Sequence, residues 1–294
     1  MLWKDQIVSE FPGVERNVPL SELTSFRVGG AARFVLRPQS YEEIKRAVAF
    51  VKSFGVPFVL LGKGTNVLAS DAGYDGVLIR FDAPMHAPIY DGVRVTVCGG
   101  TSLTQLARDT VKRGFMGLER LCGIPGTVGG ACAMNAGAYG GEIGQILRRV
   151  RLLKNGTDAW TDVRDGDLGY RRSAFSFPDA IVLEAELELC ADDGSAAETM
   201  RDCMEKRREK QPLDLPSAGS TFKRPEGYFA GALIEQCGLK GYSIGGAQVS
   251  QKHAGFIVNT GNATEADVSA LIRFVQDTVK ERTGVNLEPE VKRI

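Results

Sequence analysis

The sequence has few residues that bind transition metals. Its two histidines, His86 and His253, could be joined only by six cysteines that are scattered without a C-x-x-C pair: Cys98, Cys122, Cys132, Cys190, Cys203 and Cys237. A structural zinc site needs four such ligands at characteristic spacings. The sequence therefore predicts no metal site.

The sequence also lacks net charge and long apolar runs. Its 36 basic and 36 acidic side chains balance, so no overall field attracts nucleic acid or an anionic membrane. No apolar run approaches the roughly 20 residues that cross a bilayer, and the first residues, MLWKDQIVSEF, do not have the pattern of a secretory signal. We expect a cytoplasmic protein with reduced thiols and no nucleic-acid or membrane partner.

The sequence does contain strand and helix patterns that alternate over 294 residues, a length that exceeds one domain of roughly 100–200 residues. We predict strands at 32–38, 56–61, 76–81, 92–98, 146–153, 181–189 and 254–259. We predict helices after the cap residues Ser40, Ser102, Ser195 and Thr264, and another at 228–237. Asn155-Gly156 predicts a hairpin turn.

The predicted architecture is mixed α/β in two functional parts. The first part, residues 1–190, has two subdomains of about 1–70 and 71–190. The second part, residues 191–294, ends in a tail, Asn286 to Ile294, that we expect to return to the functional site.

A short glycine-containing loop, Gly62-Lys63-Gly64-Thr65-Asn66, follows a predicted buried strand. Glycine lets the backbone take a positive φ and lets amide N–H groups approach an anion without a Cβ in the way. The loop is neither a P-loop nor a Rossmann G-x-G-x-x-G turn. It suits a pyrophosphate, although a tight structural turn is the simpler explanation for this loop taken alone.

A second glycine-rich segment runs from Gly123 to Gly141 as GIPGTVGGACAMNAGAYGG. So many glycines cost conformational entropy on folding, and contacts between the backbone itself and a ligand would offset that loss. Two such segments in one half of the chain could wrap a dinucleotide. Close packing of a helix on a strand would explain one of them more easily than both.

Eight motifs, in this order along the chain, resemble those of the UDP-N-acetylenolpyruvoylglucosamine reductase family. Six accompany the two glycine-rich segments: Ser25–Gly30 (SFRVGG), Tyr170–Ser173 (YRRS), Gly219–Lys223 (GSTFK), Gly245–Gln248 (GGAQ), Lys252–Gly255 (KHAG) and Leu287–Val291 (LEPEV). Each motif is weak alone, but their joint order is specific. The short stretch between Tyr170 and Ser220 resembles the family's short form.

The resemblance implies an FAD-binding domain of the vanillyl-alcohol-oxidase type and a separate substrate domain. FAD would be bound without a covalent link, and NADPH would be the reductant. The residues that the resemblance assigns to the FAD site are Arg27, Gly62, Lys63, Gly64, Thr65, Asn66, Gly123, Ile124, Pro125, Gly126, Thr127, Gly129, Asn135, Ala136, Gly137, Ala138, Tyr139 and Gly140.

The resemblance also implies three catalytic residues for the reduction of UDP-N-acetylglucosamine enolpyruvate to UDP-N-acetylmuramate. Arg171 would stabilise the developing enolate, Ser220 would donate a proton to the α carbon, and Glu290 would donate a hydrogen bond to the carboxylate or orient it. Without the motifs, these residues have ordinary explanations as a surface arginine, a turn serine and a solvated glutamate.

Four further residues are expected to contact the substrate: Tyr170, Lys223, Arg224 and His253. Lys223 suits a diphosphate because phosphates need cationic partners, whereas Arg224 stands where some family members have asparagine. Two other hypotheses stay open: an FAD oxidase of the same superfamily with another small substrate, and a nucleotide-sugar-binding module without catalysis. We expect the protein to be a monomer.

Overall fold

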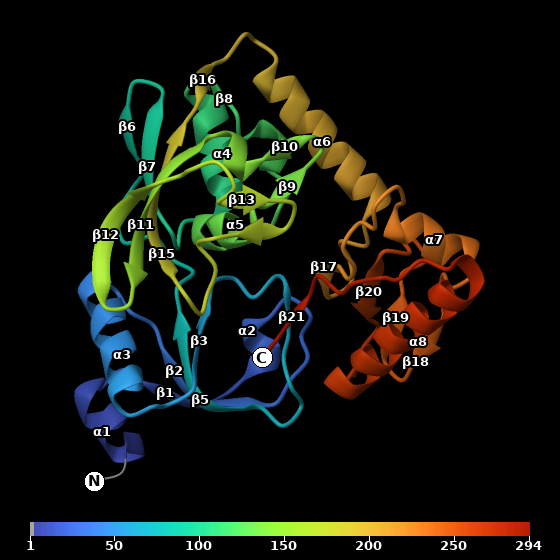
Figure 1. Cartoon of the computed structure of the whole chain (residues 1–294), viewed down its shortest axis with the longest axis horizontal. Helices are drawn as coiled ribbons and strands as arrows, with labels where there is room; N and C mark the ends of the chain where they lie inside the picture. Colours follow the sequence, from blue (N-terminus) through green and yellow to red (C-terminus); the bar gives the residue numbers. More distant parts are fainter. Residues whose placement is uncertain (1–2) are drawn as a thin grey trace. The chain divides into compact units, whose positions relative to one another are not determined.

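The computed structural model describes residues 3–294 (Figure 1). These residues form two compact units that interleave along the chain. The first unit contains residues 3–15, Phe34–Lys63 and Gly76–Arg207. The second unit contains Arg16–Arg33, Gly64–Asp75 and Arg208–Ile294. The backbone therefore passes repeatedly from one unit to the other.

The first sheet leads directly into the 62–66 loop. It has the strand order β1-β2-β5-β3, with strands β1 (Glu15–Pro19), β2 (Ala31–Leu36), β5 (Tyr74–Arg80) and β3 (Phe58–Leu61). Strands β3 and β5 are parallel. Helix α3 (Tyr41–Ser53) buries Ile44, Val48 and Val51 in a core cluster that also contains residues of β5 and of α1 (Trp3–Glu10). The predicted cap is confirmed, because the Ser40 side chain accepts a hydrogen bond from the Glu43 N–H.

A five-stranded antiparallel sheet forms the rest of the first unit's frame. Its order is β12 (Thr157–Asp162), β11 (Leu147–Lys154), β15 (Ile181–Glu188), β7 (Arg94–Cys98) and β6 (Ile89–Asp91). The predicted hairpin is confirmed, since Asn155 and Gly156 join β11 to β12 with φ angles of 51° and 79°. Helices α4 (Leu103–Lys112) and α5 (Val128–Met134) pack in the core cluster of this sheet.

The second unit has its own sheet and core. Its sheet has the order β17 (Ser217–Ser220), β20 (Phe256–Asn259), β19 (Ala247–Val249) and β18 (Ser243–Ile244), and its helices α7 (Ala230–Gln236) and α8 (Glu265–Thr283) share one apolar cluster with β19 and β20. Helix α8 begins after Thr264 as predicted. The Thr264 side chain accepts a hydrogen bond from the Asp267 N–H, and Gly284 ends the helix with φ 75°.

The remaining elements are short, apart from α6 (Ala196–Lys210). They are α2 (Leu20–Leu23), the 3-10 helices η1 (Glu119–Leu121) and η2 (Ile143–Gln145), and the strands β4 (Val67–Leu68), β8 (Phe115–Met116), β9 (Gly137–Ala138), β10 (Gly141–Glu142), β13 (Leu168–Gly169), β14 (Arg172–Ser173), β16 (Cys190–Ala191) and β21 (Lys292–Arg293). Strand β21 pairs in parallel with β4, directly after the 62–66 loop.

Two features differ from the sequence-based expectations. Ser102 occupies the position before α4 as predicted, but its side chain makes no capping hydrogen bond. Helix α5 lies inside the second glycine-rich segment, where the sequence predicts no helix because small residues carry no clear apolar face. Within residues 3–294, no helix is long and apolar enough to span a membrane, and no group of three metal-binding side chains comes together.

Candidate functional site

The two glycine-rich segments meet in the first unit. A Cβ on Gly62 would lie only 2.7 Å from the Thr127 hydroxyl oxygen. That hydroxyl accepts a hydrogen bond from the Gly130 N–H (3.2 Å) and so caps the start of α5. The missing side chain at Gly62 therefore lets the end of β3 approach the start of α5.

The second segment is also held against the end of strand β7. The Leu103 N–H donates to the Gly126 carbonyl (3.1 Å), the Val128 N–H to Thr101 (2.9 Å) and the Gly129 N–H to Gly99 (2.8 Å). A Cβ on Gly129 would lie 3.1 Å from the Gly99 carbonyl oxygen. Close packing thus accounts for Gly129.

Backbone amide groups are available at this junction. The N–H groups of Gly62 and Lys63 donate to no acceptor within residues 3–294, and both residues are only partly buried. Gly126 has φ 143°, a conformation that glycine adopts readily and other residues rarely adopt. Such N–H groups at a turn form a concavity that binds anions.

Three predicted site residues have a strained backbone conformation with a positive φ. Within residues 3–294, seven non-glycine residues have a positive φ, and four of these are asparagines, which tolerate that conformation. The other three are Arg27 (56°), Tyr139 (52°) and Arg171 (53°). Left-handed backbone costs such residues about 1–2 kcal/mol, and strain of this kind tends to persist at functional sites.

Asn135 connects α5 to the turn that carries Arg171. Its side-chain amide donates to the Glu142 carboxylate (2.9 Å) and to the Gly169 carbonyl (3.1 Å), and its oxygen accepts the Gly144 N–H (3.0 Å). Strands β13 and β14 pair on either side of Tyr170-Arg171. The Asn135 side chain is thus occupied within the protein, so this residue positions its neighbours.

In the second unit, the backbone of Glu290 lies next to Thr221, the residue after Ser220, although the two motifs are far apart in the sequence. Ser220 ends β17 and follows Gly219, whose φ is 78°. The Glu290 N–H donates to the carbonyl of Thr221 (2.8 Å), and the Lys223 N–H donates to the carbonyl of Glu288 (2.8 Å). The LEPEV motif therefore lies along the GSTFK motif, and the Glu290 side chain is buried.

Two predicted FAD-site residues of the second unit form hydrogen bonds within it: Asn66 with the C-terminal tail and Arg27 with the sheet. The Asn66 carbonyl accepts the Lys292 N–H (3.0 Å), and its side-chain amide donates to the Glu290 carbonyl (3.4 Å). The side-chain amide of Asn259, on β20, donates to the Arg27 carbonyl (3.4 Å).

The expected substrate contacts have different surroundings. Lys223 pairs with Glu288, and the Arg224 guanidinium lies 4.0 Å from the centre of the Phe229 ring. His253 Nδ1 accepts the Gly255 N–H (3.0 Å), and burial lowers the pKa of His253. The neutral His253 therefore keeps only its Nε2–H for a ligand. Tyr170 is exposed beside Arg171.

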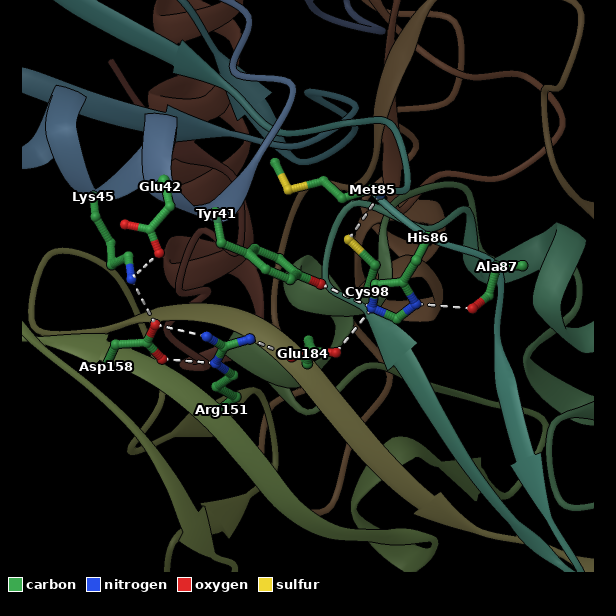
Figure 2. Close-up of polar contacts among 10 residues, drawn as sticks. All are labelled: Tyr41, Glu42, Lys45, Met85, His86, Ala87, Cys98, Arg151, Asp158 and Glu184. Atoms are coloured by element: carbon green, nitrogen blue, oxygen red, sulfur yellow. Dashed lines mark hydrogen bonds and ion pairs between the residues drawn. The ribbon is translucent and has the colours of Figure 1, made fainter.

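A separate polar network contains none of the predicted site residues (Figure 2). His86 Nε2 lies 2.8 Å from the Glu184 carboxylate and 3.0 Å from the Tyr41 hydroxyl. Arg151 donates to both Glu184 (2.7 Å) and Asp158 (2.7 and 2.8 Å). These groups connect α3 to the five-stranded sheet, so we assign the network a structural role.

Comparisons with known proteins give matches over both units. Residues 32–159 match the model of an FAD binding domain, and residues 211–294 match that of the UDP-N-acetylenolpyruvoylglucosamine reductase C-terminal domain. The reductase of that name from Caldanaerobacter subterraneus is 44% identical over 280 residues, which cover 94% of this chain and 92% of the relative. The one from Exiguobacterium sibiricum is 45% identical over 280 residues, covering 95% and 92%.

A solved structure is similar over almost the whole chain. The crystal structure of UDP-N-acetylenolpyruvylglucosamine reductase from Thermus caldophilus has 34% sequence identity and a TM-score of 0.81. The match covers 95% of this chain and 98% of that chain.

Proposed function

This chain belongs to the UDP-N-acetylenolpyruvoylglucosamine reductase family, and from that premise we propose that it uses NADPH to form UDP-N-acetylmuramate for the bacterial cell wall. It is an FAD-dependent oxidoreductase that acts on UDP-N-acetylglucosamine enolpyruvate. The predicted fold class is confirmed as mixed α/β with an FAD binding domain, and we propose that this domain is of the vanillyl-alcohol-oxidase type.

The meeting of the two glycine-rich segments at Gly62 and Thr127 carries this proposal. The backbone N–H groups of Gly62 and Lys63, together with the close approach of Gly62 to Thr127, fit the binding of a pyrophosphate. We propose that the 62–66 loop, residues 123–129 and residues 135–140 hold FAD, together with Arg27. Bound FAD supplies, in its reduced form, the hydride for the β carbon of the enolpyruvyl group.

Arg171 is proposed to stabilise the charge that forms on the substrate. Hydride addition to the β carbon leaves negative charge on the α carbon and the carboxylate. A guanidinium held in place before the reaction stabilises such charge without reorganising. The strained backbone at Arg171 and the paired strands on either side of it support a fixed orientation.

Ser220 is proposed to donate its hydroxyl proton to the α carbon. The α carbanion is basic enough to take a proton from an un-ionised hydroxyl, so Ser220 needs no unusual acidity. Glu290 is proposed to bind or orient the substrate carboxylate, and its backbone is tied to Thr221 beside Ser220. Tyr170, Lys223, Arg224 and His253 are proposed to contact the nucleotide sugar.

The proposal also includes the division of the chain into two parts, the oligomeric state and the cellular compartment. We propose residues 1–190 as the FAD part and 191–294 as the substrate part of a monomer. The compartment would be the cytoplasm, where reduced thiols are expected, and all six cysteines are free within residues 3–294.

The first experiment tests the cofactor. Purified protein should be yellow, and mild denaturation should release the flavin because no covalent bond holds it. NADPH oxidation should be stimulated by UDP-N-acetylglucosamine enolpyruvate. A colourless protein that FAD cannot reconstitute would contradict the proposal, and oxygen consumption with a small alcohol would favour an oxidase.

The second experiment tests the proton donor in stopped flow, with each half-reaction followed at the flavin absorbance. Ser220→Ala should leave reduction by NADPH largely unchanged and slow reoxidation by substrate about 10²–10⁴-fold, because only that half needs a positioned acid. Ser217→Ala on the same strand is the matched control and should behave as wild type. Reoxidation of Ser220→Ala at the wild-type rate would show that Ser220 is a turn residue.

A further inference from the structure

Helix α6 carries an arginine where its apolar stripe continues. Ala196 and Cys203 are buried, and Met200 and Met204 pack against the core of the five-stranded sheet. Residues three or four apart share one face of a helix. The next position on this face is Arg207, which is partly buried.

The Arg207 side chain lies against the second glycine-rich segment. A Cβ on Gly123 would be 2.8 Å from Arg207 Cδ and 3.3 Å from Nη1. Tyr139, at the other end of that segment, and Cys122 raise the pKa of Arg207, against the lowering by burial. Arg207 therefore lies against Gly123, in the first part of the segment that we assign to FAD.

The Arg207 guanidinium has no counter-ion in the part of the chain that the structure describes. Burial lowers the pKa of Arg207. An exposed arginine such as Arg113, in contrast, pairs with Asp109 at 2.9 Å. A partly buried cation without a counter-ion is unfavourable, and a methionine would complete the apolar stripe at less cost. An anionic ligand would offset the unfavourable burial.

We propose that Arg207 binds negatively charged atoms of FAD at the second glycine-rich segment. The inference rests on the proposed FAD site and adds to it a residue outside every motif that indicated the cofactor. A guanidinium suits this task because its planar set of N–H donors binds phosphate oxygens or a carbonyl and neighbouring nitrogen in pairs. FAD offers two such groups: the pyrophosphate, always charged, and the isoalloxazine ring, which gains negative charge on reduction.

The test uses Arg207→Met, which keeps the length and removes the charge, and Arg207→Lys, which keeps only the charge. Arg201→Met, on the exposed side of the same helix, is the matched control. FAD is titrated into the flavin-free protein, the flavin midpoint potential of the holoenzyme is measured, and thermal unfolding of the flavin-free protein is recorded.

We expect Arg207→Met to weaken FAD binding about 10–100-fold, as for a lost charge-assisted hydrogen bond. Arg207→Lys should lie between Met and wild type. The flavin-free Arg207→Met protein should unfold at or above the wild-type temperature because an unpaired charge has left a partly apolar site. Arg201→Met should match wild type in all three measurements.

The potential distinguishes the two groups on FAD. An unchanged potential means that oxidised and reduced FAD lose affinity equally, which assigns Arg207 to the pyrophosphate. A tenfold greater loss for reduced FAD makes the potential about 30 mV more negative, which assigns Arg207 to the ring.

Two outcomes would overturn the inference: FAD affinity of Arg207→Met within about twofold of wild type, or a clearly lower unfolding temperature of its flavin-free form, which would make Arg207 a packing residue. If wild type itself binds no FAD, the proposed function fails instead, so the two failures are distinguishable.

Discussion

At the scale of single residues, Gly62 gives the most direct test of the junction between the glycine-rich segments. In Gly62→Ala, the new methyl group would displace the Thr127 hydroxyl, which lies 2.7 Å from its position. Because that hydroxyl caps α5, we expect a loss of about 1 kcal/mol in the free energy of unfolding together with weaker FAD binding. Urea unfolding and FAD titration measure the two effects.

Gly13→Ala is the control for this substitution, because a Cβ at Gly13 has no neighbour within 4 Å. It should leave FAD affinity unchanged. If Gly62→Ala binds FAD as well as Gly13→Ala does, the close approach of Gly62 to Thr127 has no role in the cofactor site.

At the scale of elements, Asp158 connects β12 with β11 and α3. It accepts two hydrogen bonds from Arg151 and lies 3.2 Å from the Lys45 ammonium. The hydrogen bonds from Arg151 lower the pKa of Asp158 most, and the contact with Lys45 lowers it further. A lowered pKa stabilises the fold above the unfolded-state pKa of about 3.9, and this stabilisation is lost as the pH falls through the folded-state value.

We therefore expect Asp158→Asn to lower the free energy of unfolding at pH 7 by about 1–3 kcal/mol. The difference from wild type should shrink as the pH falls below about 4, where the wild-type carboxyl also becomes neutral. Asp162→Asn, exposed on the same strand, is the control. A difference that stays constant from pH 7 to pH 3 would show that packing, and not charge, is responsible. Denaturant unfolding across this pH range measures it.

Secondary structure was predictable where local signals decide it. The cap of α8 at Thr264 and the Asn155-Gly156 turn act over a few residues, so the sequence predicts both. Helix α5 was missed because its stability comes from contacts outside the helix. Val128 is fully buried in the core cluster, and the Val128 and Gly129 N–H groups bond to the segment after β7.

At the scale of the whole molecule, the end of the chain stabilises the segment after the 62–66 loop. The Ile294 carbonyl accepts the Ser70 N–H (2.8 Å), and the Ile294 N–H donates to Leu68 (3.2 Å). Deletion of residues 292–294 should therefore speed hydrogen exchange at Ser70 and lower the stability of the second unit.

Lys292→Ala is the control for this deletion, because it keeps the main-chain bond from Lys292 to the Asn66 carbonyl. Its exchange at Ser70 should equal that of wild type. Equal exchange in the deletion variant would mean that β21 does not stabilise β4.

The sequence by itself determined the charge balance, the locally capped elements and the order of motifs that identifies the family, because all of these are written in neighbouring residues or their sequence. Only the tertiary structure decided that Gly62 approaches Thr127, that the Glu290 N–H bonds to the Thr221 carbonyl beside Ser220, and that Arg207 lies at Gly123 without an ion pair among residues 3–294. These contacts join residues far apart in the chain. They depend on how whole elements pack, which no local pattern specifies.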